Sequence, residues 1–596
     1  MKMPHQGRRF RRIVSMSFLL AAACLLWVSG ASGEDGAEDG GAGTPVFQVP
    51  SGIYAEPFDL TISGGDGGAV VRYTLDGSVP TGDSAEYTGP IRIADRTGEA
   101  GGLAGMDPGL FTREEKEAPE TVRKGTVIRA ACFDQNGRSG ETVTATYLVG
   151  LPETGAKTIS IVADSADLFD YEKGIYVLGK TYDDWRKETP DADSYLPMAA
   201  PGNFTQRGRD WERPAHVDII GADGSLLHAQ ELGLRIMGGS TRSYYQKSFR
   251  LLARKEYGAK NVKCELIDGL KRERDGEPLE KMKSFVLRNG GQDNQGTLLR
   301  DPLIQKLVNG CRFSTQSTEP CQVYLNGEYW GAYTITEDYS DDYIEDNYDI
   351  AKDNVVMIKA GELEEGLPED LELYQSMMER ISGADFTDPE DYRWIGETMD
   401  LDSFMDYAIV QIYIDNQDSL FGIYGEANWR IWRSRVSEEG NEYGDGRWRF
   451  MLYDTENSFA MDKTDRLDLP TDRNTLGLIL QKPGEGFTEL LQKLMENEDF
   501  HAAFVSRFLQ IREECFQPDQ AVETLWEMAD RYRPLMNDQV LRNGPAEAVE
   551  EYGSGEEYFD RGISLIEAYL YGRYAQAAGM VVPGESGEEE ETEGPI

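Results

Sequence analysis

Short segments in which apolar and polar residues alternate fill residues 45–149. Examples are FDLTI, VVRYTL, IRI, TVIRAACF and TVTATYLV, and turns rich in Gly, Pro and Asp separate them. Alternation with a period of two predicts β-strands with one buried face. We therefore expect a small all-β sandwich over 45–149, which a linker over 150–156 joins to the rest of the chain.

The pattern changes again in the remainder of the chain. From residue 157, strand-like runs such as TISIVA, LGLRIM, SFVLRN and WGAYTIT follow one another with little helix between them. After residue 370, apolar residues recur with the period of an amphipathic helix. The segments with this period are 370–382, 401–414, 486–514, 519–541 and 557–578. A sheet-rich half followed by a helix-rich half predicts an α+β fold, and a cleft between two such halves is a common place for a ligand.

The start of the chain predicts export. Four arginines precede an apolar run from Ile13 to Val28, and small residues follow it. This order is typical of a secretory signal peptide, here over 1–33. A lipoprotein anchor at Cys24 is the less favoured alternative, because Ala21 rather than a leucine lies three residues before it. We expect a bacterial protein that is secreted or associated with the cell envelope.

Two further segments, 34–44 and 581–596, are rich in Gly and acidic residues, so we expect a disordered leader and a disordered tail. After the signal peptide, no window reaches the ~20 apolar residues that span a bilayer, which predicts no stable membrane span. The net charge of −46 repels nucleic acid and favours cationic partners and divalent metal ions.

The cysteines do not indicate a disulfide framework or a zinc site. Six are present, Cys24 lies in the signal peptide, and the odd number that remains includes no C-x-x-C pair. A bridge between Cys311 and Cys321 stays open at this point.

Three stretches carry residues that could bind a ligand or take part in catalysis. In the first, LGLRIMGGSTRSYYQKSFRLL, a strand ends at Gly238 and Gly239, and the next strand begins near Lys247 and Arg250. Glycines let backbone N–H groups approach a phosphate, and a lysine adds charge. A simple Gly-rich turn between two strands is the alternative.

In the second stretch, VYLNGEYWGAYTITEDYSDDY, Asn326-Gly327 predicts a tight turn between two paired strands. Glu337 and Asp338 then mark the exit from sheet into helix. They are functional candidates, but acidic residues also suit the first turn of a helix.

The third stretch, 401–462, combines a helix, a polar loop with Asp418, the segment NWRIWR that begins at Asn428, and a strand that ends at Asp454 and Glu456. Carboxylate and amide oxygens are the ligands that Mg²⁺ prefers. The alternative for Asp454 is that it only caps the next turn.

Taken in order, several motifs resemble the CotH family of atypical protein-kinase-like proteins, first associated with spore coats. They are KTISIVADSADLFDYEKGIYV, LRIMGGSTRSYYQKSFRL, TLLRDPLIQKL, VYLNGEYWGAYTITEDY, NVVMIKAG, NWRIWR and WRFMLYDTENSFA, and the resemblance spans about 157–578. It implies a kinase-like domain over 157–580, in which a β-rich lobe and a helical lobe close on ATP and on Mg²⁺ or Mn²⁺.

The resemblance also implies roles for single residues on the nucleotide side. Lys247 would reach the phosphates beside Gly238 and Gly239, and Glu337 would lie at the hinge near the adenine. The other basic positions that would line the cleft are Arg235, Arg300 and Lys359.

On the catalytic side, Asp418 would orient the substrate hydroxyl or accept its proton, with Asp415 as the alternative. Asn428 and Asp454 would hold the metal ion, as an Asn and an Asp do in protein kinases. Glu456 is a further metal candidate at a position where relatives often carry a second Asp, and Ala460 stands where a glycine is expected.

In the N-terminal part, VRYTLDGSVPT, YTGPIRI and GTVIRAACFDQNGRSG resemble the chitobiase/β-hexosaminidase C-terminal type of immunoglobulin-like module. Such modules are accessory domains, which implies an envelope or carbohydrate setting and contact with glycan as one role.

These patterns leave three hypotheses. The leading one is an exported kinase that transfers the γ-phosphoryl group of ATP to Ser or Thr of envelope or coat proteins, with basic, Ser-rich substrates. The second is a catalytically inactive kinase-like scaffold or adhesin, associated with glycans. The third is a carbohydrate-active enzyme, which no pair of carboxylates outside these motifs supports.

Overall fold

The computed structural model describes residues 43–65, 68–103, 121–191, 200–422, 426–461, 470–545 and 547–582. The expected signal peptide 1–33 with Cys24, the leader up to residue 42 and the tail from residue 583 lie outside the described residues. In the part that is described, no helix is both long and apolar enough to cross a membrane.

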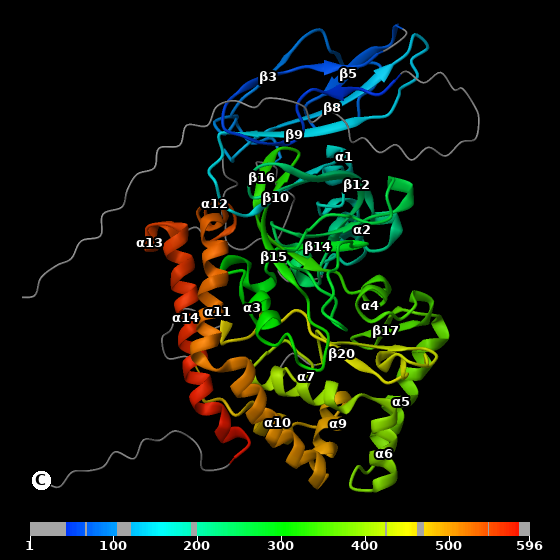
Figure 1. Cartoon of the computed structure of the whole chain (residues 1–596), viewed down its shortest axis with the longest axis vertical. Helices are drawn as coiled ribbons and strands as arrows, with labels where there is room; N and C mark the ends of the chain where they lie inside the picture. The colour runs from blue at the N-terminus through cyan, green and yellow to red at the C-terminus, as the bar shows by residue number, and fades with distance from the viewer. Residues whose placement is uncertain are drawn as a thin grey trace, which may run out of the picture. The chain divides into compact units, whose positions relative to one another are not determined.

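Residues 46–149 form the predicted β module (Figure 1). A five-stranded sheet has the order β2-β9-β8-β5-β6, and two strand pairs, β3-β7 and β1-β4, accompany it. Its apolar core includes Leu60, Ile93, Ile128 and Tyr147. The strands are β1 (Val46–Phe47), β2 (Gly52–Tyr54), β3 (Phe58–Leu60), β4 (Ile62–Ser63), β5 (Val70–Thr74), β6 (Ala85–Glu86), β7 (Ile91–Ile93), β8 (Thr126–Phe133) and β9 (Val143–Val149).

Seven strands of the next part close into a barrel with the order β10-β11-β12-β13-β14-β16-β15. Only the β10–β15 pair in it is parallel. Asn326 and Gly327 have φ of 48° and 83°, which is the conformation of the predicted tight turn between β15 and β16. The strands are β10 (Lys157–Val162), β11 (Arg213–Ile220), β12 (Leu226–Met237), β13 (Ser248–Leu252), β14 (Ser284–Arg288), β15 (Thr318–Leu325) and β16 (Glu328–Glu337).

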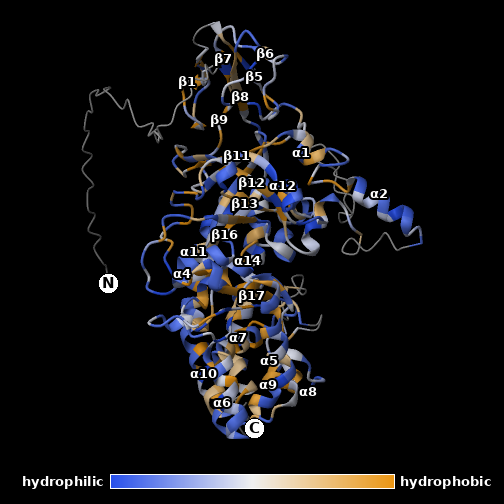
Figure 2. Cartoon of the chain, turned by 90° about the vertical axis from the view of Figure 1, so that its right-hand side faces the viewer, coloured by the Kyte–Doolittle hydropathy of each residue, from blue (hydrophilic) through white to orange (hydrophobic). Residues whose placement is uncertain are grey.

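Three helices accompany the barrel strands: α1 (Ser165–Phe169), α2 (Gly179–Glu188) and α3 (Arg300–Leu307). They differ in burial. Helix α2 has no buried side chain and is hydrophilic along its length (Figure 2). Most of α3 is buried, so its polar residues must find partners inside the protein.

A second sheet follows the barrel and has the antiparallel order β18-β17-β19-β20. Its strands are β17 (Val355–Lys359), β18 (Glu362–Glu365), β19 (Arg430–Ser434) and β20 (Arg449–Met451). Phe450 of β20 lies 4.6 Å from Tyr407 and 5.3 Å from Phe487 between ring centroids, so the sheet packs directly on two helices of the last part.

The helix-rich half lies where the sequence predicts it, with helix α7 buried along most of its length. Helix α14 packs along α11 and α12 (Figure 1). The helices are α4 (Asp341–Tyr348), α5 (Leu371–Gly383), α6 (Pro389–Thr398), α7 (Leu401–Tyr413), α8 (Thr475–Gln481), α9 (Gly486–Met495), α10 (Glu498–Phe516), α11 (Pro518–Tyr532), α12 (Met536–Asn543), α13 (Ala548–Tyr552) and α14 (Gly555–Ala577).

Two of the predicted helical segments are each divided into two helices. Within 486–514, the Asn497 side chain accepts from the backbone N–H groups of Asp499 and Phe500 and starts α10 anew. Within 519–541, Pro534 lacks a backbone N–H and lies in a 3₁₀ turn between α11 and α12. The β-rich half and the helical half confirm the predicted mixture of sheet and helix.

Candidate functional site

A cleft of about 650 Å³ opens where the barrel faces the second sheet. Strands β12, β13, β14 and β17 contribute basic side chains to it. The segments that follow α7 and β20 contribute acidic and amide side chains. The predicted site residues that line this cleft are Arg235, Gly238, Gly239, Lys359, Asp418, Asn428 and Asp454.

Two of these residues have an unusual backbone. Asp454, three residues after β20, has φ of 60°, and Asn428, two residues before β19, has φ of 48°. Asn and Asp adopt this left-handed region more readily than other residues with a side chain, but it still costs free energy. Such conformations are concentrated at functional sites, where the surrounding structure enforces them. Asp454 therefore leaves the strand in a conformation that turns its carboxylate to the cleft.

The side chains of Asp418 and Asn428 are linked. Asn428 Nδ2 donates to the Asp418 carbonyl oxygen at 2.9 Å and to Asp418 Oδ2 at 3.0 Å. Gln292 Nε2 donates to the same Oδ2 at 3.3 Å. Burial raises the pKa of Asp418, and the negative charge of Asp454 raises it further. Because Asn428 donates to Asp418, its amide oxygen points away from that carboxylate and is available to a ligand.

Arg288, the last residue of β14, joins two of the predicted metal ligands. Its Nη2 donates to Asp454 Oδ1 at 3.1 Å and also to Glu456 Oε1. Burial raises the pKa of Glu456, whose side chain is 2% exposed. Burial also favours neutral Asp454, but Arg288 and a hydrogen bond from Glu456 outweigh it and lower the pKa of Asp454. Asp454 is therefore the ionised partner, and Glu456 supports it from the buried side.

Three arginines on the strands that line the cleft already have carboxylate partners. Arg235 pairs with Glu212 at 2.6 Å, Arg250 with Asp338 at 2.5 Å, and Arg430 with Glu364 at 2.6 Å. These pairs hold the guanidinium groups in place, so only part of their charge is free for an anion.

Lys359 differs from those arginines. Its amino group lies 5.3 Å from the centroid of the Tyr453 ring, and no carboxylate of the described residues forms an ion pair with it. Burial and the nearby charge of Arg430 lower the pKa of Lys359 to about 8. Lys359 is therefore well placed to bind a phosphate, as is Arg207, a cleft residue that also has no carboxylate partner among the described residues.

Three residues that the resemblance assigns to nucleotide binding do not line the cleft. Lys247 is fully buried, and its Nζ donates to the carbonyl oxygens of Arg242 at 2.5 Å and Tyr244 at 2.8 Å. Burial lowers the pKa of Lys247 well below its usual value. Arg300, at the start of α3, is paired with the buried Asp293. In this structure both side chains serve the fold.

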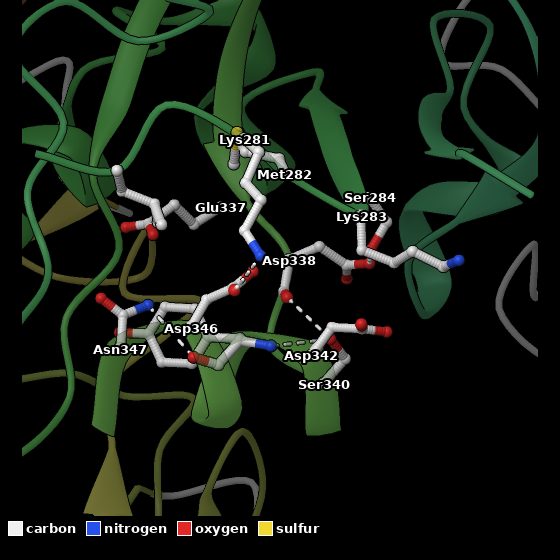
Figure 3. Close-up of a pocket in the computed structure, with 12 residues that line it drawn as sticks. Lys281, Met282, Lys283, Ser284, Glu337, Asp338, Ser340, Asp342, Asp346 and Asn347 are labelled. Atoms are coloured by element: carbon white, nitrogen blue, oxygen red, sulfur yellow. Dashed lines mark hydrogen bonds and ion pairs between the residues drawn. The ribbon is translucent and has the colours of Figure 1, made fainter. Parts of the chain in front are cut away.

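Glu337, the third, ends β16 and accepts from the Ser317 backbone N–H at 2.8 Å. Burial raises its pKa to about 8. It lines a separate pocket of about 20 Å³, which has room for roughly one water molecule (Figure 3). Across this pocket Lys281 reaches Asp346 at 3.3 Å (Figure 3). Glu337 therefore lies at the predicted junction of sheet and helix, but outside the large cleft.

The donor chemistry of the cleft fits a divalent ion. Among the described residues, no group of three or more His, Cys, Asp or Glu side chains is placed to hold a metal. The predicted metal ligands in the lining are the amide of Asn428 and the carboxylates of Asp418 and Asp454. Glu456, the further predicted metal ligand, does not line the cleft, and its raised pKa favours the protonated form that donates to Asp454. Amide and carboxylate oxygens suit Mg²⁺ and Mn²⁺.

The sequence analysis missed the segment directly after β14. Arg288 reaches Asp454, and Gln292 reaches Asp418, so one short segment contacts both acidic residues. Gly291 has φ of 54°, and a Cβ there would lie 2.8 Å from the Glu456 carboxyl carbon. The sequence feature that could have revealed this segment is Arg288-Asn289-Gly290-Gly291, a polar stretch with two glycines that ends a buried strand.

Comparison with known proteins shows that the part of the chain that contains this cleft matches a known family. The family model described as CotH kinase protein matches residues 234–575, which include every predicted site residue. A second family model, described as Fn3 associated, matches residues 60–147, within the β module expected over 45–149. A search of curated proteins found no match.

Proposed function

The chain belongs to the CotH kinase protein family, and we propose that residues 157–580 form an atypical, two-lobed protein kinase. In this proposal the barrel half and the helical half are the two lobes. The enzyme transfers the γ-phosphoryl group of ATP to Ser or Thr of exported envelope or coat proteins. The net charge of −46 favours basic, Ser-rich substrates.

The observation that carries the proposal is the composition of the cleft. Asp418, Asn428 and Asp454 line it together with Lys359 and Arg235. Phosphoryl transfer depends mainly on positioning and on neutralising phosphate charge. A cleft with oxygen donors for a metal ion and cations for phosphates supplies both.

The metal ion, when bound, would supply positive charge to the phosphates, and Asp454 and Asn428 are the residues that would hold it. Arg288 and Glu456 fix the direction and charge of the Asp454 carboxylate. The backbone of Gly238, with φ of 116°, gives a phosphate close access to the chain.

Asp418 is the proposed catalytic residue. Asn428 and Gln292 both donate to its Oδ2, so the carboxylate has a fixed direction. It would orient the substrate hydroxyl and accept its proton at a carboxylate oxygen. The raised pKa of Asp418 makes it a stronger base than an ordinary aspartate, which suits this role.

One observation favours the second candidate, a catalytically inactive kinase-like scaffold. Arg288 already neutralises Asp454 and contacts Glu456, so a metal ion must compete with a guanidinium for the same oxygens. If the Asp454 carboxylate binds Arg288 more tightly than it binds a metal ion, the cleft holds no metal and catalyses no phosphoryl transfer.

Thermal unfolding of the mature chain with ATP in Mg²⁺, Mn²⁺ or EDTA separates the two candidates. A ligand at about 100 times its dissociation constant adds roughly 2.7 kcal/mol to the free energy of unfolding. The kinase proposal expects a metal-dependent rise in Tm that Asp454→Ala abolishes. The control Asp402→Ala removes a carboxylate that is 70% exposed and should keep the rise. No rise in any condition would support the scaffold.

A further inference from the structure

Two cysteines that lie far apart in the sequence meet in the structure. Cys311 follows α3, Cys515 lies in the last turn of α10, and their sulfur atoms are 4.0 Å apart. Both side chains are half-buried, and exposed residues flank them. A disulfide requires the sulfur atoms to approach to about 2.05 Å, so the gap to close is about 2 Å. Rotation of the two cysteine side chains about their Cα–Cβ bonds can move the sulfur atoms by about this distance.

The fold holds the two thiols in this arrangement. Asp406 of α7 accepts from the Arg312 backbone N–H at 2.9 Å, and from Arg507 of α10 at 2.7 Å through each of two nitrogens. One buried carboxylate thus ties the residue after Cys311 to α10. Arg507 and Cys515 are eight positions apart, which places them on the same face of α10.

This arrangement corrects the pairing that the sequence left open. Cys321 lies in β15, fully buried in the apolar core of the barrel. Cys311 instead packs against the core of the helical half, as Cys515 does. The neighbour of Cys311 is therefore Cys515 rather than Cys321.

We propose that Cys311 and Cys515 are a redox-reactive pair that closes to a disulfide when the protein meets a disulfide oxidant of the glutathione class. The inference does not depend on kinase activity. The bond would join the loop after α3, next to the barrel, to a helix of the last part of the chain, across 204 positions.

The first step is attack by the Cys515 thiolate on one sulfur of oxidised glutathione. A bond forms between Cys515 and that glutathione, and the second glutathione leaves as a thiolate. The hydrogen bond from Cys311 and the charge of Arg507 lower the pKa of Cys515, which favours its thiolate.

In the second step Cys311 loses its proton to water, and its sulfur attacks the Cys515 sulfur. The glutathione that was bound to Cys515 leaves as a thiolate. Two electrons have passed from the cysteine pair to the oxidant, and the two released thiolates take up the two protons.

The test is peptide mapping of the full mature chain. The protein is reduced, desalted and incubated with oxidised glutathione, and free thiols are then blocked with N-ethylmaleimide. Trypsin without reductant should release peptide 307–312 joined to peptide 513–531, with the loss of two hydrogens. Labelling of Cys311 and Cys515 should fall to background and return after dithiothreitol.

Two variants serve as controls. Cys264 is a half-exposed thiol on the barrel side, and Cys264→Ser should leave the linked peptide unchanged. Cys515→Ser should abolish the link and leave Cys311 open to N-ethylmaleimide.

The wild-type map decides the proposal even if a variant folds poorly. Full labelling of both cysteines after oxidation would overturn it. A glutathione that stays on Cys515 would also overturn it, because Cys311 would then be out of reach. A link from either cysteine to Cys264 or Cys321 would do the same.

Discussion

Replacing Arg300 with methionine distinguishes a structural role from a phosphate-binding role at this position. The family resemblance places Arg300 in the nucleotide cleft, whereas the structure places it against Asp293, with both side chains only 2% exposed. Methionine keeps much of the length of the side chain and removes its charge. The Asp293 carboxylate would then stay buried without its cation.

The expected cost follows from the partners of Asp293. Removing one member of a buried ion pair costs about 3–5 kcal/mol. Asp293 keeps hydrogen bonds from Thr297 Oγ1 at 2.6 Å and from the backbone N–H groups of Thr297 at 3.1 Å and Leu299 at 3.2 Å. Arg300 Nε has no hydrogen-bond partner among the described residues, so its burial penalty disappears with the side chain. Both points favour a cost at the lower end of this range, about 3 kcal/mol of the free energy of unfolding.

Urea unfolding followed by tryptophan fluorescence measures this change. After residue 33, every tryptophan lies between residues 185 and 526, so the fluorescence reports on the part of the chain after the β module and not on the β module itself. Arg300→Met should lower the midpoint and leave the ATP-dependent rise in stability unchanged. The control Lys306→Met changes an exposed side chain of the same helix and should stay within about 0.5 kcal/mol of wild type.

The opposite pattern would refute this reasoning. If Arg300→Met costs less than about 1 kcal/mol and also removes the ATP-dependent rise, Arg300 acts on the nucleotide and the buried pair is not its main role.

Three further predictions concern the cleft and its surroundings. Asp418→Asn should keep the ATP-dependent rise in Tm and lower transfer to a basic, Ser-rich peptide by about 10²–10⁴-fold, and unchanged transfer would favour Asp415. Lys359→Met should weaken ATP binding by about 1.5–3 kcal/mol in calorimetry. Since the pKa of Lys359 is about 8, wild-type affinity should fall as pH rises through 8, and the variant should lack this fall. Glu337 binds its proton up to a pKa of about 8 when folded but only to its ordinary value when unfolded, so its contribution to stability is lost as pH rises through this window. Urea midpoints of Glu337→Gln should decline less between pH 5 and pH 8 than those of wild type.

Sequence patterns predicted the fold where local rules govern it. Alternation predicted the β module, and helical periodicity predicted the helices after residue 370, because burial of one face controls both. Closure of the seven strands into a barrel depends on the pairing of β10 with β15, which are more than 150 residues apart, and no local pattern encodes it. The breaks at Asn497 and Pro534 follow local rules and were visible in the sequence.

The candidate site was predicted in part, for a similar reason. Asp418, Asn428 and Asp454 each lie in a short segment next to a predicted helix or strand, and the structure brings all three to one cleft. Lys247 and Arg300 were assigned by motif, but a motif does not reveal which way a side chain points from its strand or helix. Arg288 was missed because its partners Asp454 and Glu456 are more than 160 residues away.

The charge pattern of the cleft implies that a metal ion should control nucleotide binding. The arginines on its strands are each balanced by a carboxylate, as in the pairs Arg250–Asp338 and Arg288–Asp454. Without a metal ion, ATP would meet Lys359, which has no ion-pair partner among the described residues, but also the charge of Asp454 and a chain with an excess of acidic residues. A divalent ion held by Asp454 and Asn428 would change this balance, because it would supply positive charge beside the carboxylate that Arg288 now contacts. Nucleotide affinity should therefore depend on the metal more strongly than on any single arginine.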